Sequence, residues 1–394
     1  MPNDSPKKTV LQKSLPSAYY HSEEIFAREK EHIFAREWFC AAREEQVARP
    51  GDYLVLNLAG ESVLVVRDKN GEVKAHYNVC RHRGARLQPA PGEEVNGDIK
   101  LSGGVLGANG IRCAYHQWTY GLDGRLLNAP HTKEGDGFCK ADFSLYPVGA
   151  EIWGGFVFLN LSPGNASIEG RTLKMQFSEA IERVKRYPLS DLRIARRLTY
   201  EVQANWKVVM ENYNECYHCG GVHPELCDVV PAFRQAGGAS LEWERGVPHR
   251  EGAVTFTWTG KTTRAAFPGL NEDEKMRHKG ELIYPNLMLN WYEGHLDTNL
   301  VLPLGVDRTR VVFEFYFAPA AGDAGREAAH QQSIAVAERI QHEDVAICES
   351  VQRGLASRAY RAGRLSVRRE AGEHLFHRLL ARDLRRGVAC VEAR

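Results

Sequence analysis

The chain has 394 residues, 43% of them hydrophobic and 26% charged, so it is long enough for two domains with separate cores. Its formal net charge of +1 gives no electrostatic reason to expect nucleic acid or an anionic membrane as a partner. No run of about 18 apolar residues occurs, and no apolar segment follows Lys7 and Lys8, so we expect a cytoplasmic protein without a membrane span.

The first part of the chain is predicted to be a helix followed by short strands. Residues 22–37 have Ser22 as a helix N-cap, glutamates in the first turn and spaced apolar residues. From Trp38 to about residue 162, apolar runs alternate with turn signals such as the Asn70–Gly71 pair. This texture predicts a small all-β domain.

Four metal-ligand residues stand in two pairs within this β domain, Cys80-x-His82 and Cys113-x-x-His116. Two thiolates and two imidazoles can hold a [2Fe–2S] cluster, with cysteines on one iron and histidines on the other. Neutral histidines in place of thiolates raise the reduction potential of such a cluster. The two pairs therefore predict a one-electron carrier, with a zinc-binding module as an alternative.

The second part of the chain is predicted to be α+β. A helix is expected at about 173–186, and residues 282–294 and 298–319 show the alternation of antiparallel strands, with a turn at 305–308. From 324 to 355 the apolar period lengthens to that of a helix, and a basic helical tail follows. We expect an antiparallel sheet packed against a long C-terminal helix.

A second pair of histidines, His218 and His223, follows in this part. On an ideal helix of 3.6 residues per turn their rings would point about 140° apart, so a regular helix cannot aim both at one ion. Gly220 and Gly221, with Pro224 after them, permit the broken turn that would. The alternative is two unrelated histidines in a core helix.

Asp344 is the best candidate for a third ligand, because two imidazoles and one carboxylate form the triad that binds non-haem Fe(II). It lies on the apolar stripe of the predicted helix 324–355, where a carboxylate is costly unless it is paired or binds a metal. Glu343 is expected to point away from this stripe, towards water. The alternative for Asp344 is a salt bridge to Arg339 or Arg353.

Three further polar residues lie around His218. Glu215 is a candidate link between the two metal centres, because a carboxylate can fix the orientation of a ligand imidazole; a solvated glutamate is the equal alternative. Asn212 is a second catalytic candidate in the same segment. Cys216 and Cys219 form a C-x-x-C that could be redox-active or metal-binding, but ordinary thiols are favoured, because the pair flanks His218 inside another motif and no second C-x-x-C completes a zinc site.

These motifs resemble the Rieske-type non-haem iron oxygenases, specifically their α subunit. The resemblance rests on CRHRG at Cys80, CAYHQW at Cys113, NWKVVMENYNECYHCGGVHPEL at Asn205 and HEDVAICESVQRGL at His342, and covers about residues 15–390. It implies a Rieske domain at 38–162 and a helix-grip catalytic domain built from 1–37 and 163–394.

The resemblance implies the following ligands: Cys80, His82, Cys113 and His116 for the cluster, and His218, His223 and Asp344 for a mononuclear Fe(II). It also implies a homotrimer, a separate flavin/iron–sulfur reductase that uses NAD(P)H, and insertion of oxygen from O₂ into a small substrate. The chain departs from the family in a long, glycine-rich stretch between the cluster pairs (about 87–111), read as an extended loop. Ala114 and Gln117 replace a common proline and glycine, and Glu215 replaces a common aspartate.

The substrate is expected to be a methylated ammonium compound, because several segments are similar to the branch that acts on glycine betaine, choline, carnitine and stachydrine. Aromatic faces hold such a cation well, and the candidates are Tyr213, Trp258, Trp291 and Tyr292. The first alternative is hydroxylation of an aromatic acid. The alternative from another class is a Rieske electron-transfer protein without oxygenase chemistry.

Overall fold

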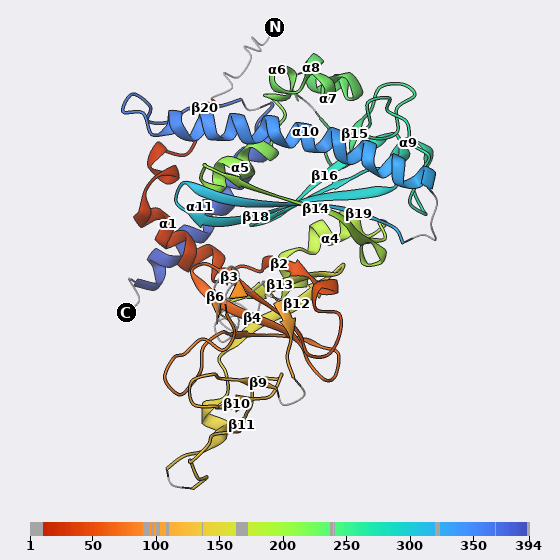
Figure 1. Cartoon of the computed structure of the whole chain (residues 1–394). Helices are drawn as coiled ribbons and strands as arrows, with labels where there is room; N and C mark the ends of the chain where they lie inside the picture. Colours follow the sequence, from red (N-terminus) through yellow and green to blue (C-terminus); the bar gives the residue numbers. More distant parts are fainter. Residues whose placement is uncertain are drawn as a thin grey trace. The chain divides into compact units, whose positions relative to one another are not determined.

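The computed structural model describes residues 11–89, 94–95, 98–99, 103–107, 110–135, 137–162, 172–236, 239, 241–319, 324–366 and 368–391 (Figure 1). The chain forms two compact units, one of residues Lys30–Ser178 and one that combines the chain up to Glu29 with the residues from Glu179 on. The domain limits drawn from the sequence, 37/38 and 162/163, stay predictions. Among the described residues, no helix is long and apolar enough to cross a membrane.

The unit 30–178 contains a seven-stranded antiparallel sheet. Its strands, in spatial order, are β2 (Phe39–Arg43), β13 (Phe156–Asn160), β12 (Pro147–Trp153), β5 (Val73–Tyr77), β4 (Glu61–Arg67), β3 (Asp52–Leu58) and β8 (Gly103–Val105). All four residues from Val63 to Val66 in β4 are buried, so both faces of the sheet are covered at its centre.

A three-stranded sheet in the same unit carries the second cluster pair. It consists of β11 (Leu126–Asn128), β10 (Thr119–Tyr120) and β9 (Ile111–Arg112). Cys80 and Cys113 belong to the apolar core around these strands, together with Trp118 and Tyr120. The all-β character predicted for this part of the chain is confirmed.

The prediction of one extended loop at about residues 87–111 is partly wrong, because strands lie within it. Residues 103–105 form strand β8, which pairs with residues 52–54 of β3. Strands β6 (Glu94–Val95) and β7 (Asp98–Ile99) pair with each other. Residues 90–93, 96–97, 100–102 and 108–109 lie outside the described residues.

The other unit contains a six-stranded antiparallel sheet. Its spatial order is β14 (Arg193–Val202), β19 (Arg308–Phe317), β18 (His295–Gly305), β17 (Leu287–Trp291), β16 (Arg277–Ile283) and β15 (Val247–Pro248). The hairpin of β18 and β19 pairs continuously from His295↔Phe317 to Gly305↔Arg308, apart from one bulge. Its turn lies at 305–308, as the sequence predicted.

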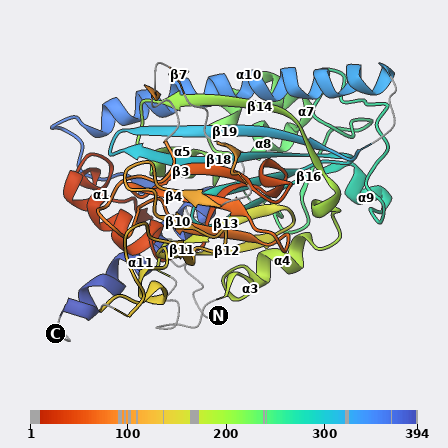
Figure 2. The ribbon, with the colours of Figure 1, turned by 60° about the horizontal axis from the view of Figure 1, so that its bottom comes forward.

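Helix α10 (Ala324–Leu355) runs along this sheet in both views (Figures 1 and 2). Phe313, Phe315 and Phe317 on β19 form a buried cluster with Ile334 and Ala337 of α10. Packing of a long helix on an antiparallel sheet confirms the predicted α+β helix-grip class. Helix α11 (Ala371–Val391) lies in the part of the chain that was predicted to be a basic helical tail.

Two predicted helices are interrupted. The helix expected at 22–37 is α1 (Glu23–Glu29) followed by a π-helical turn, Lys30–Phe34. The one expected at 173–186 is split into α3 (Leu173–Gln176) and α4 (Ser178–Val184). Phe177 lies between them and is buried against Phe158, with ring centroids 5.2 Å apart. The free energy gained by burying this ring favours the interrupted helix over a continuous one.

Short elements complete the fold. They are β1 (Gln12–Lys13), which pairs with β20 (Arg364–Leu365), the helices α5 (Trp206–Tyr213), α6 (Cys219–Val222), α7 (Pro224–Val229), α8 (Pro231–Ala236) and α9 (Glu272–Lys275), and the 3₁₀ turns at 17–20, 44–47, 140–143 and 189–191. Asn205 caps α5, because its side chain accepts a hydrogen bond from the backbone amide of Lys207.

Candidate metal centres and substrate cavity

The four predicted cluster ligands lie together in the unit 30–178. Cys80 and Cys113 are buried, whereas His82 is exposed and His116 half-buried. The rings of His82 and His116 are 4.7 Å apart between centroids, and the ring of Trp118 stacks on His82. Two buried thiols and two more exposed imidazoles, brought close together, are a donor set that fits a [2Fe–2S] cluster held by two cysteines and two histidines.

The Tyr120 hydroxyl lies 3.2 Å from the Cys80 sulfur and accepts a hydrogen bond from the backbone amide of Arg81. Burial raises the pKa of Tyr120 well above its usual range, so the hydroxyl keeps its proton. A thiolate at Cys80 would therefore receive a hydrogen bond, which stabilises negative charge on sulfur. Sequence reasoning missed Tyr120, although its place in the buried T-Y strand after the second pair was a signal.

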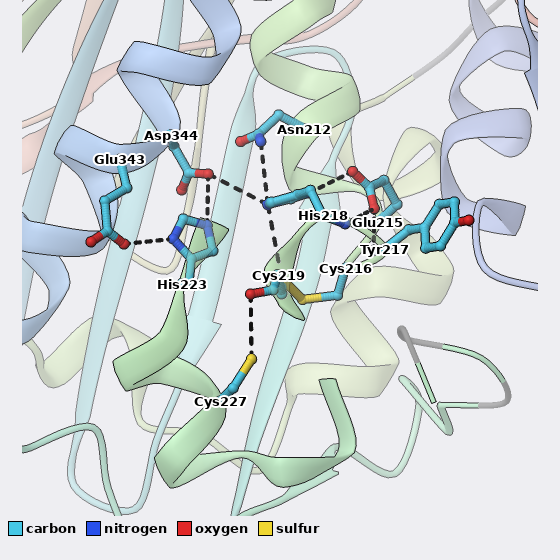
Figure 3. Close-up of a disulfide and its surroundings, with 10 residues drawn as sticks. All are labelled: Asn212, Glu215, Cys216, Tyr217, His218, Cys219, His223, Cys227, Glu343 and Asp344. Atoms are coloured by element: carbon cyan, nitrogen blue, oxygen red, sulfur yellow. Dashed lines mark hydrogen bonds and ion pairs between the residues drawn. A yellow bond between two sulfur atoms is a disulfide. The ribbon is translucent and has the colours of Figure 1, made fainter. Parts of the chain in front are cut away.

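The three predicted iron ligands also come together. All lie in the unit that combines the chain up to Glu29 with the residues from Glu179 on, which is called the catalytic unit after the catalytic domain expected there. Asp344 Oδ1 lies 3.0 Å from His223 Nε2 and 3.5 Å from His218 Nε2 (Figure 3). His218 precedes α6 and His223 follows it, where the backbone leaves helical angles (φ −120°, ψ 71°). This break in the helix aims both rings at Asp344, and three converging donor atoms fit a mononuclear iron.

Carboxylates hold the far nitrogen of each ring. Glu215 Oε1 lies 2.5 Å from His218 Nδ1, and Glu343 Oε2 lies 2.8 Å from His223 Nδ1 (Figure 3). The expectation that Glu343 points to water is therefore wrong. Glu343 stands one residue before Asp344 on α10. Its side chain is longer, and it reaches the other nitrogen of the His223 ring. Asn212 Nδ2 is 3.3 Å from His218 Nε2.

The histidines and carboxylates at this centre shift each other's pKa values towards the charged forms. Burial disfavours the charged form of the His218 ring, but Asp344 and Glu215 outweigh it and raise its pKa to about 9. Burial also opposes ionisation of Asp344, but the two histidines hold the pKa of its carboxyl below its usual range. The site therefore keeps Asp344 as a carboxylate, the form that binds a metal.

Cys216 and Cys219 form a disulfide beside this centre (Figure 3). The prediction that they are ordinary thiols is wrong. The disulfide closes the turn that carries Tyr217 and His218. Its Cys219 sulfur lies 3.8 Å from His218 Nε2.

A cavity of about 460 Å³ opens on the three predicted iron ligands. Its wall contains His218, His223 and Asp344, and aromatic rings from several elements: Tyr213, Phe233, Trp243, Phe256, Tyr292 and Phe313. Of the four aromatic candidates from the sequence, Tyr213 and Tyr292 line the cavity. Trp258 is half exposed and Trp291 is stacked on Tyr187 within the core, so the structure does not bring these two to it.

Comparison with known proteins gives two family matches. Residues 37–147 match the Rieske [2Fe-2S] domain, and residues 189–385 match the ring hydroxylating alpha subunit (catalytic domain). The chain is 32% identical to the carnitine monooxygenase oxygenase subunit of Escherichia coli K12 over 93% of each chain. It is 30% identical to the chloroplastic choline monooxygenase of Arabidopsis thaliana, over 94% of this chain and 82% of that protein.

Solved structures of Rieske oxygenases match this chain as well. The crystal structure of the quaternary ammonium Rieske monooxygenase CntA with L-carnitine superposes with a TM-score of 0.70 at 27% identity, over 95% of this chain and 96% of that chain. Naphthalene 1,2-dioxygenase from Rhodococcus sp., at 20% identity and a TM-score of 0.70, shares the fold.

Proposed function

Because this chain belongs to the Rieske ring-hydroxylating oxygenases as their alpha subunit, we propose that it hydroxylates or N-demethylates a methylated ammonium compound. The chain is an oxidoreductase whose cofactors are a [2Fe–2S] cluster and a mononuclear iron. The observation that carries the substrate proposal is the cavity, whose wall contains both aromatic rings and the proposed iron ligands. An electron-transfer protein without an oxygenase site, or a zinc module, does not agree with the catalytic domain.

We assign Cys80, His82, Cys113 and His116 to the cluster, and His218, His223 and Asp344 to the iron. When bound, the cluster delivers single electrons and the Fe(II) offers open positions for O₂. Glu215 and Glu343 orient the two ligand rings by accepting hydrogen bonds from their Nδ1–H groups. Asn212 offers an amide beside His218 at the cavity wall.

The electrons are proposed to come from NAD(P)H through a separate flavin/iron–sulfur reductase, in the cytoplasm. The relatives' description as oxygenase subunits agrees with a divided system. We also propose a homotrimer, in which Glu215 links the iron to the cluster of a neighbouring subunit. Its second oxygen accepts hydrogen bonds from the backbone amides of Tyr217 and His218, which fixes the carboxylate in place.

A substrate screen tests the proposed function. The purified enzyme, a surrogate reductase and NADH are incubated in air with glycine betaine, choline, carnitine and a set of aromatic acids. Oxidation of a carbon next to nitrogen is expected to couple NADH consumption to formaldehyde or another aldehyde. A hydroxylated arene with no product from any ammonium compound would instead establish the aromatic-acid alternative.

Replacing Glu343 with glutamine is expected to weaken Fe(II) binding about 10- to 100-fold, because losing the carboxylate behind a ligand histidine typically has this effect. The change keeps the side chain's shape but removes the charge that stabilises the protonated Nδ1 of His223. Fe(II) affinity is measured by equilibrium dialysis. Glu327→Gln, an exposed position on the same helix, is the matched control and should bind iron normally. Unchanged affinity in Glu343→Gln would mean that Glu343 does not orient His223.

A further inference from the structure

The sheet face that lines the cavity carries a polar patch of three residues. Asn290 on β17 pairs directly with Asp297 on β18, and Asn299 lies two residues further on β18. All three line the cavity, beside the apolar Leu282, Met288 and Phe313 of the neighbouring strands. Polar side chains on the inner face of a buried sheet are costly, so this patch calls for a partner.

Asp297 brings a buried carboxyl group into the cavity. Its side chain is almost completely inaccessible, and Asn290 Nδ2 donates a hydrogen bond to its Oδ1 at 2.7 Å. Among the described residues of the cavity wall there is no lysine or arginine. Burial raises the pKa of Asp297 to about 7, and the hydrogen bonds with Asn290 and Tyr292 oppose that rise only in part. Its hydrogen-bond partners are neutral side chains, and no lysine or arginine among the described wall residues pairs with it.

Asn299 adds an acceptor without a donor. Its side chain is more than nine-tenths buried, and no donor among the described residues reaches its Oδ1. The Asn290 amide is already used on both sides, since its Oδ1 accepts from the Tyr213 hydroxyl at 2.8 Å and its Nδ2 donates to Asp297. The patch therefore presents a charge and an acceptor to a ligand, and both favour a cation or a hydrogen-bond donor.

We propose that Asp297 is the counter-ion of the substrate and that the substrate is a net-cationic methylated amine without a carboxylate. Choline-like compounds have this chemistry, whereas zwitterions such as glycine betaine and carnitine do not. This inference rests on the proposed function and narrows its substrate class. A zwitterion would bring a second carboxylate into a cavity whose described wall offers it no Lys or Arg, next to a carboxylate already there.

A matched pair of ligands tests the inference. Glycine betaine and glycine betaine amide have nearly the same shape, but the first is a zwitterion and the second a cation. Their dissociation constants are measured by anaerobic calorimetry on the iron-loaded holoenzyme. The amide is expected to bind at least about tenfold more tightly, since close charge pairs at binding sites commonly contribute this much or more. Choline should likewise bind better than 3,3-dimethyl-1-butanol, its uncharged analogue.

The variant Asp297→Asn assigns the preference to this residue. Asparagine keeps an oxygen that can accept from Asn290 but removes the charge. The variant is expected to lose most of the preference for the amide over betaine, through weaker binding of the amide. Asp307→Asn, in the exposed turn of the same β-hairpin, is the matched control and should keep the preference. Cluster absorption and iron content report that each variant is folded.

The outcomes separate the two levels of the proposal. If the wild-type enzyme neither binds nor oxidises any methylated ammonium compound, the proposed function fails. If it binds and oxidises them but holds betaine as tightly as the amide, the function stands and the counter-ion inference is overturned. If Asp297→Asn weakens both ligands equally, Asp297 has a structural role only, and the inference is likewise overturned.

Discussion

Replacing Asp344 with alanine is expected to abolish turnover while the purified protein keeps the visible absorption of its Rieske cluster. Asp344 supplies the one carboxylate that reaches both ligand histidines. Without it the site has two imidazoles and no anionic ligand, so Fe(II) is lost. Loss of a carboxylate that only supports a ligand histidine typically lowers activity roughly 10- to 100-fold. Loss of the ligand Asp344 should lower turnover by more than that.

The measurement is iron per chain, determined together with the cluster's absorption and substrate turnover. Wild-type protein should hold one more iron per chain than the cluster accounts for, and Asp344→Ala should lack that iron only. The reciprocal variant, Cys80→Ser, should lose the cluster and its colour, because Cys80 is a proposed cluster ligand and is buried in the unit 30–178. Turnover by Asp344→Ala at a rate near that of wild type would show that the iron triad is assigned wrongly.

Replacing Lys207 with methionine is expected to lower the free energy of unfolding of the catalytic unit by about 3–5 kcal/mol. Lys207 Nζ lies 2.7 Å from Glu29 Oε1, and neither side chain is accessible to water. The other Glu29 oxygen accepts a hydrogen bond from the Trp206 indole at 2.8 Å. Methionine fills the space of the lysine but leaves the Glu29 carboxylate buried without its counter-ion.

Urea denaturation, followed by tryptophan fluorescence, measures the loss. The double variant Glu29→Leu with Lys207→Met should recover at least half of it, since it leaves no buried charge unpaired. Lys185→Met breaks an ion pair with Glu182 in which both side chains are about two-thirds exposed, and should cost less than about 1 kcal/mol. A loss in Lys207→Met no larger than in Lys185→Met would mean that the buried pair is not held as two charges.

The metal ligands could be predicted from the sequence because their chemistry restricts residue type and spacing. Cys80 and His82, or His218 and His223, stand close enough along the chain for local geometry to bring them to one ion. Asp344 was predicted from a carboxylate on an apolar helix stripe, and the structure places it against both histidines.

The cavity could not be predicted in the same way. Phe233, Trp243 and Phe256 reach it from segments with little regular periodicity, so no pattern marked them. Trp291 was misplaced because it lies on a strand with one side to the cavity and one to the core, and its ring packs against Tyr187. Strand β8 was missed because its two glycines are typical of loops.

The catalytic unit is assembled from both ends of the chain, and this affects the order in which the two units can fold during synthesis. Glu29 leaves the ribosome 178 residues before Lys207, its buried partner. At about 5–20 residues per second, that interval lasts roughly 10–35 seconds. In this time every described strand of the seven-stranded sheet emerges, and all of them find their partners within residues 30–178. The unit 30–178 can therefore complete its sheet before the residues that pack against α1 of the catalytic unit have been synthesised.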